Sequence, residues 1–190
     1  MHSMTAAVAA TAAALTDYQR RWPAEAAAIE QFMALIGATD NPYARERTSG
    51  HFTASCWLVD NSSARVLLTH HRKLQRWLQL GGHADGDDDL PRVALREAQE
   101  ESGLDGLRVE RELFDIDRHW IPERGDVPGH WHYDARYVVH AGMDENYVVS
   151  EESHDLGWRD IAAIVDDPAA DVSLRRMGAK WLARLSAGDS

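Results

Sequence analysis

The stretch GGHADGDDDLPRVALREAQEESGL, residues 81–104, places three glutamates on a segment whose pattern predicts a helix. Glu97, Glu100 and Glu101 stand at positions i, i+3 and i+4, so their side chains leave one helix face about 5–6 Å apart. Like charges this close destabilise a helix unless a cation lies among them, and hard oxygen ligands suit Mg²⁺ or Mn²⁺. On spacing alone, a solvated acidic face paired with Arg92 and Arg96 explains the pattern at least as well.

The composition of the whole chain predicts a soluble intracellular protein. Its 190 residues include 44% hydrophobic residues and seven Trp, which is enough to bury a core. The net charge of −11 argues against a nonspecific nucleic-acid binder. A single Cys56 fits a reducing compartment, and no apolar run approaches the ~20 residues that span a bilayer. We therefore expect a cytoplasmic location, no nucleic-acid partner and no membrane partner.

Hydrophobic periodicity predicts both helices and strands along the chain. The expected helices cover 5–36 (as two helices), 91–102 and 173–185, and the expected strands cover 51–60, 65–71, 76–80, 106–120 and 130–141. Neighbouring strands are too close in sequence for a series of βαβ units, so we expect an α+β fold with a mixed sheet flanked by helices. Residues 1–45 are interpreted as an N-terminal helical extension that can mediate a homodimer, and residues 46–190 as the main domain.

The spacing of residues 82–104 resembles the Nudix box of the Nudix hydrolase superfamily. That pattern runs Gly, five residues, Glu, seven residues, then Arg-Glu-U-x-Glu-Glu-x-Gly-U, where U is aliphatic. Asp88 stands where the pattern has Glu, and Ala98 is a small U residue. The positions that match are Gly82, Arg96, Glu97, Glu100, Glu101, Gly103 and Leu104.

The resemblance implies an α/β/α sandwich that hydrolyses a diphosphate bond in a nucleoside diphosphate derivative, such as a nucleotide, nucleotide sugar or dinucleotide. It implies Mg²⁺ (or Mn²⁺) held by Glu97, Glu100, Glu101 and the Gly82 carbonyl, with Arg96 orienting Glu97. The general base in this superfamily is either Glu97 or a glutamate of a later loop. Glu151 and Glu152 lie in a suitable loop, and we favour Glu152.

Three further residues are candidates for substrate binding: His83, Arg76 and His132. His83 follows the two glycines, and Arg76 belongs to a basic stretch that can attract a phosphate. A period of two places His130, His132, Asp134 and Arg136 on one strand face, which we expect to meet the substrate. His-x-His is also a known zinc spacing, so a zinc site there is the alternative.

Two other functions fit the same segment. A Nudix domain with weak catalysis can serve as a nucleotide-binding or regulatory module, although such modules typically lose the carboxylates that this chain keeps. A Nudix-like diphosphate isomerase would need a catalytic cysteine, whereas the apolar flank of Cys56 predicts a buried core thiol. Residues outside the box do not identify the diphosphate substrate.

Overall fold

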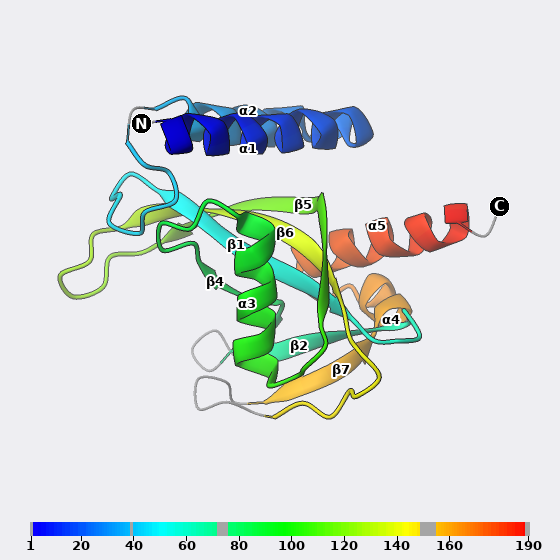
Figure 1. The fold of residues 1–190 in the computed structure, drawn as a ribbon. Helices are drawn as coiled ribbons and strands as arrows, with labels where there is room; N and C mark the ends of the chain where they lie inside the picture. The colour runs from blue at the N-terminus through cyan, green and yellow to red at the C-terminus, as the bar shows by residue number, and fades with distance from the viewer. Residues whose placement is uncertain (1, 39, 72–75, 149–154, 189–190) are drawn as a thin grey trace. The chain divides into compact units, whose positions relative to one another are not determined.

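The computed structural model describes residues 2–38, 40–71, 76–148 and 155–188 (Figure 1). Its helices are α1 (His2–Arg21), the 3₁₀ turn η1 (Pro23–Glu25), α2 (Ala26–Ile36), α3 (Leu90–Ser102), α4 (Ile161–Asp166) and α5 (Val172–Gly188). Its strands are β1 (His51–Val59), β2 (Arg65–His71), β3 (Arg76–Leu78), β4 (Leu80–His83), β5 (Arg108–Ile121), β6 (His130–His140) and β7 (Leu156–Asp160). The expected segment 76–80 thus divides into β3 and the start of β4.

The strands form a mixed sheet, and the fold is α+β as the sequence predicts. The order along the sheet is β3-β2-β1-β6-β5, while β4 pairs with β1 and β7 pairs with β2. The chain divides into two compact units that alternate along the sequence. Unit 1 contains residues 1–55, 82–94 and 110–137, and unit 2 contains residues 56–81, 95–109 and 138–190.

In unit 1, α1 and α2 run side by side and α2 supplies apolar side chains to the core (Figure 1). The Phe32 ring of α2 lies 6.0 Å from the ring of Phe52 in β1 and 5.2 Å from that of Tyr133 in β6. Tyr43, from the connection before β1, stacks on Phe52 at 5.4 Å. This connection is rich in polar residues, but Tyr43 is buried, so part of the connection belongs to the core.

In unit 2, β2 lies between β7 and β3 in antiparallel pairs, with Leu67 opposite Trp158 and His70 opposite Trp77. Asp160 at the end of β7 caps α4, because its Oδ1 accepts a hydrogen bond from the Ala163 N–H at 2.7 Å. Helix α5, which the sequence predicts at 173–185, buries Leu174, Met177 and Trp181, and the Trp181 Nε1–H donates to the Ser63 carbonyl at 2.9 Å.

Strand β1 is buried along its whole length, from residue 51 to residue 59, including its polar positions. Within unit 1 the cause is polar pairing: the Thr53 and Ser55 hydroxyls donate to Asp134 Oδ1 at 3.0 and 2.7 Å. A hydroxyl that has a buried partner does not need solvent. Cys56 is buried in this strand, as the sequence predicts.

Candidate functional site

Helix α3 begins at a capped N-terminus in unit 1. Asp89 Oδ1 accepts from the Arg92 backbone N–H at 3.3 Å, and the Asp89 carbonyl accepts from the Val93 N–H at 3.0 Å. Asp87 binds the Arg92 guanidinium at 2.6 and 3.0 Å. These aspartates are therefore cap and loop residues, and the helix starts within a residue of the predicted position.

Asp88, the residue that departs from the Nudix pattern, lies between two aspartates that already bind arginines. Asp87 pairs with Arg92, and Asp89 Oδ1 lies 3.1 Å from the Arg111 guanidinium. A neighbour that replaced the missing glutamate would first have to release its arginine. These ion pairs therefore oppose a role for Asp87 or Asp89 in place of Asp88.

In unit 2, the first glutamate of the α3 face is oriented by its neighbour along the chain. The Arg96 guanidinium donates to Glu97 Oε1 at 2.9 Å, and its Nε lies 4.0 Å from Glu100 Oε1. The Glu97 side chain is only 16% exposed, whereas that of Glu100 is 64% exposed. A charge-assisted hydrogen bond to a half-buried carboxylate fixes its direction. This geometry matches the orienting role that the resemblance implies for Arg96.

The third glutamate of the face is joined to the glycine pair. Glu101 Oε1 accepts a hydrogen bond from the Gly81 N–H at 2.7 Å, the length of a strong charge-assisted bond. Gly82, the predicted carbonyl ligand, is the next residue in β4. The bond therefore holds one carboxylate of the helix against the strand that carries the glycines.

Gly103 ends the helix in a conformation that favours glycine, with φ of +67°. A Cβ at this position would lie 3.2 Å from Val148 Cβ. We expect Gly103→Ala to lower the free energy of unfolding by about 1–2 kcal/mol, because an L-residue is strained at positive φ and the added Cβ would crowd Val148. Urea unfolding of the purified variant measures the change.

Gly106→Ala is the matched control for this prediction. Gly106 has φ of +69°, but a Cβ there would meet no atom of the described residues within 4 Å. Both variants carry the backbone strain, and only Gly103→Ala adds the contact with Val148. A loss in Gly103→Ala no larger than that in Gly106→Ala would contradict a role for this contact.

In unit 1, two of the predicted substrate-binding residues lie together, joined by a histidine that the sequence did not single out. The ring centroids of His83 and His132 are 4.9 Å apart, and the His51 ring lies 5.4 Å from His83 and 5.0 Å from His132. The three residues come from β4, β6 and β1. Segments distant in sequence thus place three imidazoles side by side.

These histidines are held in the neutral form. Burial, followed by the charges of Arg45 and His51, lowers the pKa of His83 to about 4. Burial is also the main reason that the pKa of His132 falls to about 2, with smaller contributions from neighbouring imidazoles, and that the pKa of His51 is lowered. Neutral imidazoles offer lone pairs rather than positive charge. The group is therefore better suited to a metal ion than to an anion.

The polar face of β6 was predicted to meet the substrate, which is wrong for its last two members. Asp134 and Arg136 are both buried, and Arg136 Nε donates to Asp134 Oδ2 at 2.8 Å. Arg136 also donates to the buried Asp115 Oδ2 at 3.1 Å. The period-two pattern assigned the face correctly, but internal ion pairs occupy it instead of solvent or substrate.

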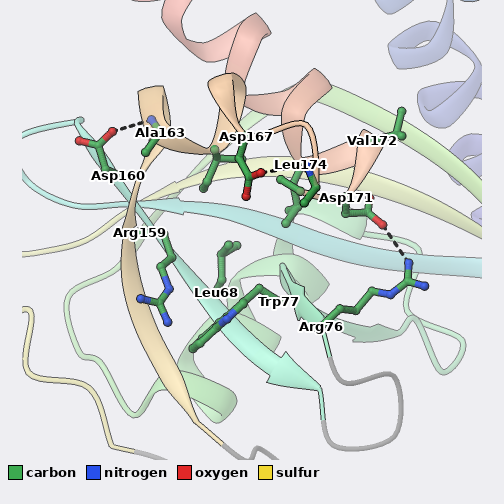
Figure 2. Close-up of a pocket in the computed structure, with 13 residues that line it drawn as sticks. Leu68, Arg76, Trp77, Arg159, Asp160, Ala163, Asp167, Asp171, Val172 and Leu174 are labelled. Atoms are coloured by element: carbon green, nitrogen blue, oxygen red, sulfur yellow. Dashed lines mark hydrogen bonds and ion pairs between the residues drawn. The ribbon is translucent and has the colours of Figure 1, made fainter.

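Arg76, the third predicted substrate-binding residue, belongs to unit 2 and lines a cavity of about 740 Å³ there. Its guanidinium lies 3.1 Å from Asp171 Oδ2, as Figure 2 shows. The Arg159 guanidinium lies over the Trp77 ring at 3.9 Å in the same cavity. Arg76 is thus engaged by a carboxylate. The candidate bases Glu151 and Glu152 lie outside the residues that the structure describes.

Comparison with known proteins identifies the class. The family model "NUDIX domain" matches residues 50–180, and the chain belongs to this family of hydrolases. The fold and the family thus confirm the resemblance, and they make this chain a Nudix-type pyrophosphohydrolase. No curated protein matches the chain. Among the described residues, no helix is long and apolar enough to cross a membrane.

Solved structures with the same fold cover most of the chain. A NUDIX-family hydrolase from Clostridium perfringens is 26% identical, with a TM-score of 0.53, over 71% of this chain and 97% of its own. A C. elegans Ap4A hydrolase is 15% identical, with a TM-score of 0.54, over 72% and 98%. The E. coli dihydroneopterin triphosphate pyrophosphohydrolase is 16% identical, with a TM-score of 0.55, over 70% and 95%. The last two likenesses concern the fold alone.

Proposed function

We propose that this protein is a Mg²⁺-dependent (or Mn²⁺-dependent) hydrolase that cleaves the diphosphate bond of a nucleoside diphosphate derivative. The observation that carries the proposal is the orientation of two α3 carboxylates. Arg96 binds Glu97 at 2.9 Å, and the Gly81 N–H binds Glu101 at 2.7 Å. A catalytic metal site needs ligands that are held in place before the substrate arrives.

The donor set of α3 fits a hard divalent cation. Glu97, Glu100 and Glu101 offer carboxylate oxygens and Gly82 offers a carbonyl oxygen, which are the ligand types that Mg²⁺ and Mn²⁺ prefer. Glu97 and Glu101 are carboxylates that hydrogen bonds already hold in place, at 2.9 Å from Arg96 and 2.7 Å from the Gly81 N–H. The exposed side chain of Glu100 is free to turn toward a substrate-bound cation.

Each residue then has a separate task. When bound, Mg²⁺ neutralises the diphosphate and polarises its phosphoryl oxygens. Glu97, Glu100, Glu101 and the Gly82 carbonyl hold the cation, and Arg96 fixes Glu97. Glu152 accepts a proton from the attacking water, with Glu97 and Glu151 as the alternatives. A positioned base contributes roughly 10²–10⁴-fold to the rate.

A panel of nucleoside triphosphates, nucleotide sugars and dinucleoside polyphosphates tests this function. We expect release of phosphate or a nucleoside phosphate from at least one class with Mg²⁺ or Mn²⁺, and no release in EDTA. Restoring Mg²⁺ after EDTA treatment should restore the rate, because the cation is a reversible ligand of carboxylates. Tight nucleotide binding without turnover of any compound would instead favour the nucleotide-binding module.

Glu152→Gln and Glu151→Gln form a matched pair of variants that tests which residue is the general base. Loss of kcat in Glu152→Gln alone supports the proposed assignment, since the two residues are adjacent and identical in type. Loss of kcat in Glu151→Gln alone transfers the role to Glu151. Full activity in both variants contradicts a base in this loop and leaves Glu97.

A further inference from the structure

His51, His83 and His132 in unit 1 are not among the proposed ligands of the cation that the α3 carboxylates bind. Each can offer one ring nitrogen, and these atoms all lie within 4.8 Å of one another. We propose that the three histidines form a binding site for a zinc-class transition-metal ion. We call the group the trihistidine site. Its ligand chemistry, nitrogen rather than oxygen, separates it from the proposed Mg²⁺ site.

The hydrogen bonding of His51 is typical of a histidine that binds a metal ion. Its Nδ1 lies 3.2 Å from the Arg47 carbonyl oxygen, which can only accept, so Nδ1 carries the proton and donates. The other ring nitrogen, Nε2, is buried and has no hydrogen-bond partner among the residues that the structure describes. Metal-binding histidines typically donate one N–H to a backbone carbonyl and bind the ion with the other nitrogen.

A chain of hydrogen bonds through His130 determines which ring nitrogen of His132 carries the lone pair. His130 Nδ1 lies 2.9 Å from the Pro128 carbonyl oxygen, so it donates and leaves His130 Nε2 as an acceptor. His130 Nε2 lies 3.2 Å from His132 Nε2, which must therefore carry the proton. The Nδ1 of His132 keeps the lone pair. Thus both His51 and His132 have one nitrogen committed to donation and one available to a metal.

The charged groups around His83 act in opposite directions. The Arg45 guanidinium lies 3.4 Å from His83 Nδ1, a long contact, and its positive charge opposes a bound dication. Arg45 Nε also lies 3.4 Å from Asp85 Oδ1, and both side chains are about half exposed. Arg45 can therefore stay with Asp85 when His83 binds a metal. Asp85 favours the dication.

Ligand type and distance indicate which ion binds. Three imidazoles suit Zn²⁺ or Co²⁺, whereas Mg²⁺ prefers oxygen. With Zn–N bonds of about 2.0–2.1 Å, two ligands of a tetrahedral ion are about 3.4 Å apart. Small side-chain rotations bring nitrogens that are now within 4.8 Å to this separation. Three histidines leave the fourth position open to water or to another ligand, as in catalytic zinc sites.

Co²⁺ titration of the metal-free full-length protein tests the trihistidine site. We expect the visible absorption of tetrahedral Co²⁺ to saturate at a single ion per chain, to disappear on adding Zn²⁺, and to survive an excess of Mg²⁺. His51→Gln and His132→Gln should each weaken Co²⁺ binding by at least about tenfold. His140→Gln removes a histidine of unit 2 that is not part of the site. This variant should bind Co²⁺ with the same affinity as the wild type.

Two further measurements keep the test decisive if a histidine variant is poorly folded. Zn²⁺ should raise the Tm of the wild type, because an ion that binds only the native state stabilises it. Arg45→Met should bind Co²⁺ more tightly, since it removes the opposing charge and keeps all three ligands. The proposal would be overturned if the wild-type protein takes up neither Co²⁺ nor Zn²⁺, or if both histidine variants bind Co²⁺ as tightly as the wild type does. Because binding is read without substrate, failure of diphosphate hydrolysis would not affect this outcome.

Discussion

Glu101→Gln is expected to lower kcat/KM for diphosphate hydrolysis by on the order of 10³-fold. Glutamine keeps an oxygen that can accept the hydrogen bond now made to Glu101 by the Gly81 N–H at 2.7 Å, so the helix and strand stay joined. What the variant loses is the negative charge that binds the cation. Charge stabilisation by a metal contributes several kcal/mol to the transition state, and each 1.36 kcal/mol is a factor of ten. Steady-state hydrolysis at saturating Mg²⁺ measures the loss.

Glu30→Gln is the control for this variant. Glu30 is an exposed residue of α2, so the same chemical change there should leave kcat/KM within about twofold of the wild type, because isolated surface substitutions have small effects. Glu100→Gln should resemble Glu101→Gln. Full activity in Glu101→Gln would show that Glu101 is a structural acceptor for Gly81 and not a metal ligand.

Arg136→Met is expected to lower the free energy of unfolding by about 3–5 kcal/mol. The Arg136 side chain is 3% exposed and lies 2.8 Å from Asp134 and 3.1 Å from Asp115, both of which are buried. A third carboxylate, Asp117, lies 3.4 Å away. Methionine fills much of the volume but leaves two buried carboxylates without their cation. Urea unfolding followed by fluorescence of the seven Trp measures the change.

Arg20→Met provides the comparison for a surface pair. Arg20 lies 2.7 Å from Asp17, but both side chains are well exposed, and such pairs contribute about 0–1 kcal/mol. The difference between the two variants therefore isolates the effect of burial. Equal losses in Arg136→Met and Arg20→Met would contradict the view that the Asp115–Arg136–Asp134 cluster stabilises unit 1.

Features set by local sequence were predictable. The cap residues, the helix of the Nudix box and its final glycine depend on neighbours within a few positions, so α3 and Gly103 appear where the pattern predicts them. Helix α5 was predictable for the same reason. The family was likewise predictable from the spacing of residues 82–104, and the match of the family model over residues 50–180 confirms it. The division of the chain at residue 45 stays a prediction.

Features that depend on distant segments were not predictable. A period of two indicates which residues share a strand face, but it does not show whether that face meets solvent or another buried side chain. Asp134 and Arg136 were assigned to the substrate for this reason. His51 was missed because its partners, His83 and His132, are brought to it only by strand pairing. The one indication of a metal site in the sequence was the His-x-His spacing of His130 and His132.

Calorimetric titration with Mg²⁺ tests most directly whether the α3 carboxylates bind the catalytic cation. Mg²⁺ is chosen because it prefers oxygen and will not report on the trihistidine site. We expect the wild type and Glu30→Gln to bind Mg²⁺ with the same affinity, and the double variant Glu97→Gln/Glu101→Gln to lose at least about tenfold, since two charged ligands are removed. Unchanged Mg²⁺ affinity in a folded double variant would contradict the proposed metal site.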